Sequence, residues 1–224
     1  MDKRAFLSGH PLFGALDRAA QERLAAFARE RPMQAGEVLF RRGDTQSFML
    51  AVIAGEVRVT IPSAEGRERS IATFHAGDLL GEIALLDGRP RTADAVARTD
   101  GRLLVFERRD LLPVLRAAPE MALALIAMLC ARLRRTSDQV EEQSFLDLPT
   151  RLARALLRAA DGAGRVSATQ QELAEMVGAT RESVNRRLRA WEEAGHLHLG
   201  KASLSIVGRP ALLRAAAGGE AGEP

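Results

Sequence analysis

The feature that most restricts the fold of this chain is a series of short segments between residues 33 and 106 in which apolar and polar residues alternate. A period of two is typical of β-strands that bury one face. The predicted strands are residues 37–40, 48–53, 56–61, 70–74 and 102–106. Turn-forming sequences with glycine separate them. Several short strands at this spacing favour an antiparallel barrel or a rolled double sheet.

Helical periodicity flanks this β-rich segment. We expect a helix over about 11–30, a short helix over 108–115 and a long helix over about 120–145. Apolar or small residues recur along the long helix at steps of three and four: Leu123, Ile126, Cys130, Leu133, Ser137, Val140 and Ser144. This heptad pattern favours a parallel two-stranded dimer, and the alternative is a helix that packs only on its own barrel.

One loop of the β-rich segment, residues 81–93, concentrates groups that suit a sugar phosphate. Gly81 has no Cβ and leaves room for a ligand beside the backbone. The carboxylate of Glu82 can accept a hydrogen bond from a ribose hydroxyl, and Arg91 offers a fork of N–H donors for a phosphate. Further anion contacts can come from the backbone N–H groups of Ile83 and Ala84 and from the hydroxyl of Thr92.

Residues 169–191 have the pattern of two short helices joined by a tight turn. Thr169 and Glu172 form a capping box that opens the first helix, and Gly178 suits the turn after it. Thr180 can cap the second helix. The apolar residues of that helix share one face: Val184, Leu188 and Trp191. This pattern predicts a helix-turn-helix, and two alternating strands around a Gly200-Lys201 turn predict a wing after it.

The other face of the second helix carries side chains that can read DNA. Arginine can bond guanine O6 and N7 together, and glutamate can accept from cytosine N4. The alternative is ordinary ion pairing between residues four apart on a solvated helix. The candidate DNA-contacting residues are Thr169, Gln170, Thr180, Arg181, Glu182, Ser183, Asn185 and Arg186.

The run from Gly81 to Ala93 resembles the phosphate-binding cassette of cyclic-nucleotide-binding domains, and nearly the whole chain resembles bacterial regulators of the cyclic AMP receptor protein type. The resemblance implies an α+β fold with an N-terminal antiparallel β-roll (jelly-roll-like), a long dimerisation helix and a C-terminal winged helix-turn-helix. The implied division is a cyclic-nucleotide-binding domain (1–118), the dimerisation helix (119–146) and a DNA-binding domain (147–212). The resemblance does not cover the tail (213–224), which we expect to be disordered because it ends in an Ala/Gly/Glu-rich sequence.

The resemblance also implies roles for residues outside the cassette. In this family a Thr-Ser pair on the long helix reaches the nucleobase, with the Ser supplied by the partner subunit. Thr136 and Ser137 match that pair, and Arg132 would face the ligand one turn earlier. The Arg-Glu-x-x-x-Arg pattern at residues 181–186 reads a TGTGA-like half-site in the resembling regulators.

Cyclic AMP is the expected effector. Cyclic GMP stays open as an alternative, because it has the same phosphate and ribose as cyclic AMP. Thr92 also resembles the Thr that follows the Arg in eukaryotic cyclic-GMP-binding cassettes, whose hydroxyl can accept from the guanine 2-amino group. A family member that senses a different small molecule is a further alternative, which Glu82 and Arg91 disfavour. A regulatory subunit that only binds cyclic nucleotide is disfavoured by the helix-turn-helix.

Composition and the remaining residues argue against a disulfide-bonded or metal-binding protein, a membrane or secreted protein, and an enzyme. One cysteine, Cys130, permits no internal disulfide and disfavours a Cys-ligated cluster. No apolar run reaches the ~20 residues that span a bilayer, and no signal-peptide core is present, so we expect a cytoplasmic protein without a membrane partner. We expect no enzyme and no catalytic residues, because no nucleophile–base set is evident. His196 and His198 lack further ligands at metal-binding spacing, so no metal is expected.

The expected partners are therefore a cyclic nucleotide, double-stranded DNA with a two-fold symmetric site, and a second copy of the chain through the 119–146 helix. RNA polymerase is a further expected partner. The turn at residues 161–164 is short, however, where the family often has a longer loop that touches the polymerase. The net charge of only +3 means that the location of basic residues carries more information than their number.

Overall fold

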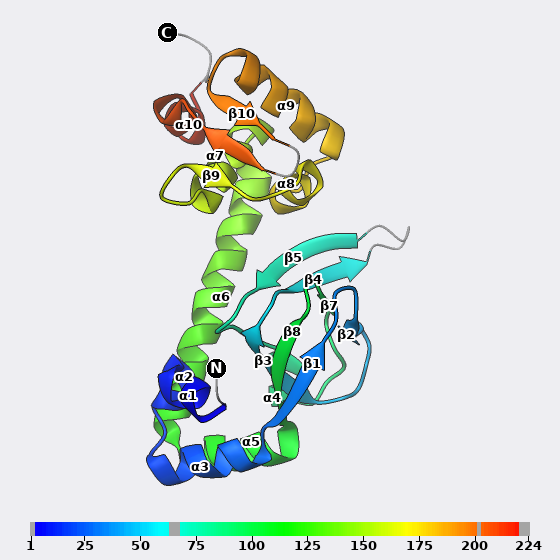
Figure 1. Ribbon diagram of the computed structural model, residues 1–224, viewed down its shortest axis with the longest axis vertical. Helices are drawn as coiled ribbons and strands as arrows, with labels where there is room; N and C mark the ends of the chain where they lie inside the picture. The colour runs from blue at the N-terminus through cyan, green and yellow to red at the C-terminus, as the bar shows by residue number, and fades with distance from the viewer. Residues whose placement is uncertain (1–2, 63–67, 201–202, 220–224) are drawn as a thin grey trace. The chain divides into compact units, whose positions relative to one another are not determined.

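The computed structural model describes residues 3–62, 68–200 and 203–219, and Figure 1 traces these elements. The chain forms two compact units, the first ending at Arg132 and the second starting at Leu133. The division falls within the predicted dimerisation helix. No single helix among the described residues is both long and apolar enough to span a membrane. Helices α5 (Arg108–Ala117) and α6 (Pro119–Phe145) meet that requirement only as a pair bent by 111°.

The first unit contains two four-stranded antiparallel sheets, with strand orders β1-β8-β3-β6 and β2-β7-β4-β5. The strands are β1 (Arg29–Met33), β2 (Val38–Phe40), β3 (Phe48–Ala54), β4 (Val57–Pro62), β5 (Glu68–Phe74), β6 (Leu79–Leu80), β7 (Asp94–Ala97) and β8 (Gly101–Glu107). All five predicted strands are present, with ends that differ by at most two residues. The alternation pattern did not reveal β1, β6 or β7, since β6 has two residues and β1 is mostly exposed.

Strand β3 lies between two hydrophobic cores. Met49, Ala51 and Ile53 pack against the helices of this unit, and Leu50 and Val52 pack against the second sheet in the interior of the roll. Both sets are buried because successive side chains of a strand point to opposite faces. The roll therefore consists of two sheets that enclose one core, and the helices cover the outer face of one of them.

The predicted single helix over 11–30 is wrong, because two short helices occupy that range: α2 (Pro11–Gly14) and α3 (Arg18–Phe27). A further short helix, α1 (Lys3–Gly9), precedes them. The Asp17 side chain accepts from the Ala20 N–H and caps α3, which fixes a new start inside the predicted helix. The end is also earlier than expected, since Arg29 pairs with Val105 as the first residue of β1.

Helix α5 (Arg108–Ala117) leads through Ala118 into the long helix α6 (Pro119–Phe145), which matches the predicted 120–145. Met121 and Leu125 of α6 are buried in the core that also contains residues of α5 and β3. Large apolar side chains on other faces of α6 are exposed: Leu123, Ile126, Leu133, Val140 and Phe145.

The second unit is a winged helix-turn-helix. It contains α7 (Leu148–Ala159), β9 (Arg165–Val166), α8 (Gln170–Val177), α9 (Arg181–Glu193), β10 (Leu197–Leu199), β11 (Leu204–Ile206) and α10 (Arg209–Ala216). Strands β10 and β11 form the predicted wing, whose Lys201 lies outside the described residues. The predicted α+β class, with a roll, a long helix and a winged helix-turn-helix, is confirmed.

The predicted start of a disordered tail at residue 213 is wrong. Residues 213–216 belong to α10, because Ala211, Leu212 and Ala215 are buried in the core of the second unit together with Leu152 and Leu156 of α7. The Arg154 guanidinium also donates to Ala216 O at 2.8 Å and holds the end of this helix. The last five residues of the predicted tail, 220–224, lie outside the described part of the chain.

Candidate functional site

The predicted phosphate-binding loop begins where β6 ends, at a glycine that no other residue can replace without a shift. Gly81 has φ of +82° and is the N-cap of the short helix α4 (Glu82–Asp87). A Cβ at this position would lie 2.5 Å from Nη1 of Arg91 and 3.1 Å from Phe48 O. Glycine is therefore required both by the left-handed backbone and by the close approach of the arginine.

Arg91 is buried beside Gly81, although the sequence predicts an arginine that faces a ligand. Its Nη1 donates to Gly81 O at 2.8 Å and its Nη2 to Phe48 O at 2.7 Å. The guanidinium carbon lies 4.2 Å from the ring centre of Phe40 and 4.3 Å from that of Phe48. The sequence did not predict either aromatic contact, because both phenylalanines lie in predicted strands and have the pattern of ordinary core residues.

The charge of Arg91 is incompletely compensated. The side chain is buried, with 3% exposure, and it forms no ion pair with any carboxylate of the described residues. Within the same part of the chain, its Nε has no hydrogen-bond acceptor. Burial lowers the pKa of Arg91 to about 10, although the negative charges of Asp44 and Glu82 oppose that change. At neutral pH the site therefore contains a buried cation with an unused donor.

Glu82 is also buried, and its partner is Arg132. Arg132 Nη1 donates to Glu82 Oε1 at 2.6 Å, and Arg132 Nη2 donates to Leu79 O. The Arg132 guanidinium lies 5.1 Å from the ring centre of Phe74. Arg132 belongs to α6 and is the last residue of the first unit. The pair therefore connects the binding loop to the long helix within that unit. The sequence predicted both members of the pair but not their direct contact.

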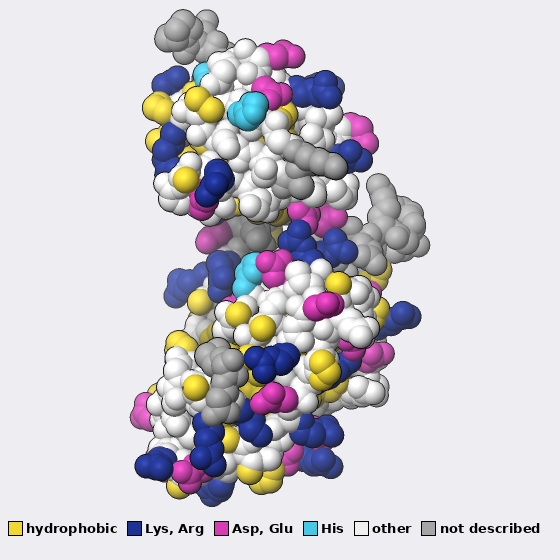
Figure 2. Space-filling view, viewed as in Figure 1, with side chains coloured by type: hydrophobic (Ala, Val, Ile, Leu, Met, Phe, Trp, Pro, Cys, Tyr) yellow, Lys and Arg dark blue, Asp and Glu magenta, His cyan; other side chains and the backbone are white. Residues whose placement is uncertain are grey.

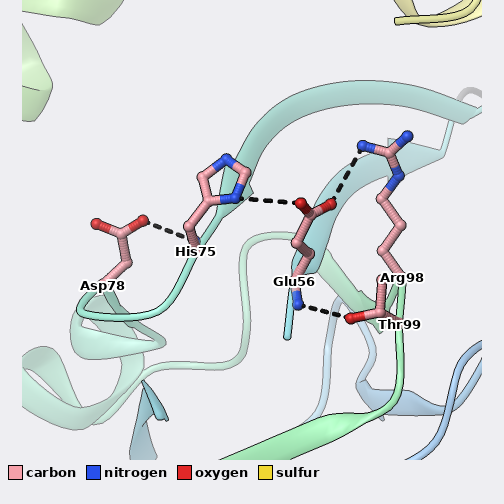
Figure 3. A network of polar contacts seen from close by, with 5 residues as sticks. All are labelled: Glu56, His75, Asp78, Arg98 and Thr99. Carbon is pink, nitrogen blue, oxygen red and sulfur yellow. Dashed lines mark hydrogen bonds and ion pairs between the residues drawn. The ribbon is translucent and has the colours of Figure 1, made fainter. Parts of the chain in front are cut away.

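A polar network at one end of the roll fixes the loop that precedes β6 (Figure 3). Oε1 of Glu56 lies 3.5 Å from His75 Nδ1, and Oε2 accepts from Arg98 Nη1 at 3.4 Å. The Glu56 N–H donates to the Thr99 hydroxyl, and the His75 N–H to Asp78 Oδ2. These contacts join three connecting segments, which contain Glu56, residues 75–78 and residues 98–99. The middle segment leads directly into β6 and Gly81, so the network sets where the binding loop starts.

The other predicted ligand residues are placed differently. The Thr92 side chain is exposed, and Ile83 is exposed while Ala84 is buried in the first turn of α4. The N-cap of α4 is Gly81, which has no side chain that could accept a hydrogen bond from the first N–H groups of the helix. Thr136 and Ser137 are exposed residues of α6 in the second unit.

The predicted helix caps of the second unit are present. The Thr169 hydroxyl accepts from the Glu172 N–H at 3.2 Å, and the Glu172 carboxylate accepts from the Thr169 N–H at 2.7 Å. Gly178 ends α8 with φ of +65°, and the Thr180 hydroxyl accepts from the Ser183 N–H at 3.2 Å. These caps define the starts of α8 and α9 and the tight turn between them.

Helix α9 separates an apolar and a polar face as predicted. Val184, Leu188 and Trp191 are buried in the core of the second unit. Arg181, Glu182 and Arg186 are exposed, and none of the three forms an ion pair within the described residues.

Other predicted DNA contacts are less accessible than the sequence suggests. Gln170, Ser183 and Asn185 are half-buried, and Oδ1 of Asn185 is buried without a partner among the described residues. Figure 2 shows Lys and Arg interspersed with Asp and Glu on its visible face, so charge alone does not mark a DNA-binding surface there. Across the described part of the chain, no group of three His, Cys, Asp or Glu side chains could hold a metal ion.

Comparison with known proteins identifies the two units. Residues 30–118 match the cyclic nucleotide-binding domain family, and residues 150–215 match the Crp-like helix-turn-helix domain family. The cyclic AMP receptor protein of Thermus thermophilus is 35% identical over 89% of this chain and 94% of its own length. A CRP-like cAMP-activated global transcriptional regulator of Mycobacterium tuberculosis is 32% identical over 81% of this chain and 85% of its own length.

A solved structure supports the same relationship. The c-di-GMP responsive global regulator CLP of Xanthomonas campestris matches with a TM-score of 0.76 and 25% identity, covering 85% of this chain and 99% of the other. These relatives are transcription regulators and not enzymes, in agreement with the prediction. The chain therefore belongs to the family of transcription regulators of the cyclic AMP receptor protein type, with a cyclic-nucleotide-binding domain and a Crp-like helix-turn-helix.

Proposed function

We propose that this protein is a cytoplasmic, dimeric regulator that binds specific DNA in response to a cyclic nucleotide, with cyclic AMP as the first-choice effector. In this proposal Glu82 accepts from the ribose 2′-hydroxyl and Arg91 holds the cyclic phosphate. Nucleotide binding selects the dimer arrangement in which the two α9 helices enter successive major grooves one helical turn apart.

The observation that carries the proposal is the buried guanidinium of Arg91. A buried charge is costly unless it is paired, and Arg91 has only carbonyl acceptors and an Nε without a partner among the described residues. A phosphate supplies both the missing acceptor and the opposite charge. The absence of a Cβ at Gly81 and the buried carboxylate of Glu82 then suit a ligand that joins a phosphate to a sugar.

The proposed dimer uses the exposed face of α6. Leu123, Ile126, Leu133 and Val140 are each more than half exposed and occupy heptad positions, so a second copy of the helix removes them from water. Burial of such side chains is worth about 1.5–3 kcal/mol each, which is enough to stabilise a dimer. Cys130 occupies the same heptad and is also exposed.

The proposed DNA contacts are the exposed polar residues of α9. Arg181, Glu182 and Arg186 have the functional groups that read guanine and cytosine edges. Their lack of ion pairs within the described chain disfavours the alternative in which they only stabilise the helix. Thr169, Gln170, Thr180, Ser183 and Asn185 are proposed to contact the phosphate backbone or adjacent bases, and RNA polymerase remains a proposed partner.

The choice of base rests on hydroxyl groups. Thr136 and Ser137 are proposed to meet the adenine amino group, and the names of the Thermus and Mycobacterium relatives agree with cyclic AMP. Thr92 is exposed beside Arg91 and keeps cyclic GMP as the second candidate. The Xanthomonas relative, which responds to c-di-GMP, makes a different nucleotide the third.

Calorimetric titration of the full-length protein with cyclic AMP, cyclic GMP and cyclic di-GMP tests the proposal. Arg91→Leu should weaken binding by about 1.5–3 kcal/mol, which is roughly 10- to 150-fold. Arg89→Leu is the matched control, because Arg89 is an exposed arginine of the same loop. Unchanged affinity in Arg91→Leu, or no binding of any of the three nucleotides by the wild type, contradicts the proposal. Arg91 also bonds Gly81 and Phe48, so unfolding by urea is measured in parallel.

A further inference from the structure

The C-terminal end of α4 is held by a side chain that contacts none of the predicted ligand residues. The last carbonyls of any helix lack partners within the helix. In α4 the Gly88 N–H satisfies Ala84 O at 3.1 Å. The next two carbonyls accept from one arginine: Arg108 Nε donates to Leu85 O at 2.7 Å, and Arg108 Nη2 donates to Leu86 O at 3.2 Å. A cation at this end of a helix also interacts favourably with its dipole.

The surroundings of Arg108 hold its guanidinium at the C-terminal end of α4. Its guanidinium lies against the turn after α4, since a Cβ on Gly88 would meet Arg108 Nη2 at 3.5 Å. Its backbone N–H donates to Ser47 O at 3.0 Å, which anchors the residue to the start of β3. It forms no ion pair with a carboxylate of the described residues, whereas the neighbouring Arg109 pairs with Glu107 at 2.9 Å.

Arg108 also occupies a mechanically important position, because it is the first residue of α5. One residue, Ala118, separates α5 from the long helix α6. Arg108 therefore joins two helices, α4 and α5, that have different proposed roles. Helix α4 starts with Glu82 beside Gly81, and α5 leads into the helix whose apolar face is proposed to form the dimer.

We propose that Arg108 is a positioning residue that transmits nucleotide occupancy from α4 to α5 and α6. This inference rests on the proposed function. In this proposal nucleotide binding acts on Gly81 and Glu82 at one end of α4, and the six-residue helix responds as one unit. The two hydrogen bonds at the other end carry that movement into α5. Leu85 of α4 packs in the same core as Leu111 of α5 and Leu125 of α6, so the connection continues through close-packed side chains.

The experiment uses the full-length protein and separates coupling from stability. Arg108→Met keeps an unbranched stem of similar length but removes all N–H donors, and Arg108→Lys keeps the charge but loses the fork that reaches two carbonyls. Arg109→Met is the matched control, since its side chain is 78% exposed. For each variant, fluorescence anisotropy gives the Kd for a DNA duplex without nucleotide and with saturating cyclic AMP. The ratio of the two values is the coupling factor.

We expect Arg108→Met to reduce the coupling factor about fivefold or more, Arg108→Lys to retain an intermediate value, and Arg109→Met to match the wild type. A role in stability alone lowers Tm but leaves the ratio unchanged, so an unchanged ratio in folded Arg108→Met overturns the inference. If that variant does not fold, a wild-type ratio in Arg108→Lys overturns it. If the wild type couples nucleotide to DNA binding but Arg108→Met keeps the wild-type ratio, the inference fails and the proposed function stands. A wild type that binds no cyclic nucleotide, or that binds DNA equally with and without it, overturns both.

Discussion

Replacing Gly81 with alanine tests the geometry of the binding loop, because the new methyl group collides with the proposed phosphate anchor. The added Cβ would lie 2.5 Å from Arg91 Nη1, and Phe48 O blocks another direction at 3.1 Å. Gly36 provides a matched control: its φ of +84° is nearly the same as the +82° of Gly81, and no described atom lies within 4 Å of its added Cβ. Both substitutions incur the strain of an alanine in the left-handed region, about 1–2 kcal/mol.

The difference between the two variants therefore isolates the collision. Arg91 must retreat and lose its 2.8 Å bond to Gly81 O, and a hydrogen bond to a charged group is worth about 1.5–3 kcal/mol. We expect Gly81→Ala to be less stable than Gly36→Ala by that amount in urea unfolding. Its affinity for cyclic AMP in calorimetry should fall about tenfold or more, while Gly36→Ala should bind like the wild type. Equal stability and equal affinity in the two variants would refute the close contact between Gly81 and Arg91.

Four further predictions follow from other parts of the chain. Arg186→Ala should lose about 1–3 kcal/mol of discrimination at one G·C pair per half-site in band-shift assays; equal weakening on random duplex would make Arg186 a phosphate contact. Thr92→Ala should lower cyclic AMP and cyclic GMP affinity equally, and a wild-type preference for cyclic GMP that the variant erases would instead identify Thr92 as the selector. Mild oxidation should crosslink the exposed Cys130 to its counterpart in a parallel, in-register dimer, with Cys130→Ser as control; a dimer that never crosslinks contradicts that register. Arg158 lowers the pKa of Glu142 below its ordinary 4.5, so this pair should stabilise the second unit above about pH 4.5 and lose its effect as pH falls. Because the Arg158 side chain is more than half exposed, Glu142→Gln should reduce stability at pH 7 by only about 0.5–1 kcal/mol and flatten the acid dependence of urea unfolding; an unchanged profile contradicts it.

The sequence predicted the elements whose signal is local. Period-two alternation located five strands, and the Thr169 and Thr180 caps fixed both helices of the helix-turn-helix, because each signal depends on residues within a few positions of one another. The helix over 11–30 was wrong, since its apolar spacing continues through the cap at Asp17 that divides it. The start of the tail was wrong because burial of Leu212 against α7 depends on a contact distant in sequence.

The same distinction applies to the site. Residue types and spacing predicted Gly81, Glu82 and Arg91 as neighbours within one loop. They did not predict that Phe40 and Phe48 enclose the Arg91 guanidinium, because these rings come from two other strands and have the ordinary appearance of core residues. The contact of Arg132 with Glu82 joins positions 50 residues apart, so a pattern within one segment contains no sign of it.

The central claim is that a cyclic nucleotide bound at Arg91 and Glu82 controls DNA binding by α9. The most direct measurement is the affinity of the full-length protein for a duplex with two inverted TGTGA-like half-sites one helical turn apart, with and without saturating cyclic AMP. We predict that the nucleotide tightens binding about tenfold or more, and that Arg91→Leu loses this response while it keeps the nucleotide-free affinity. Equal affinity of the wild type for the duplex with and without each cyclic nucleotide would contradict the account.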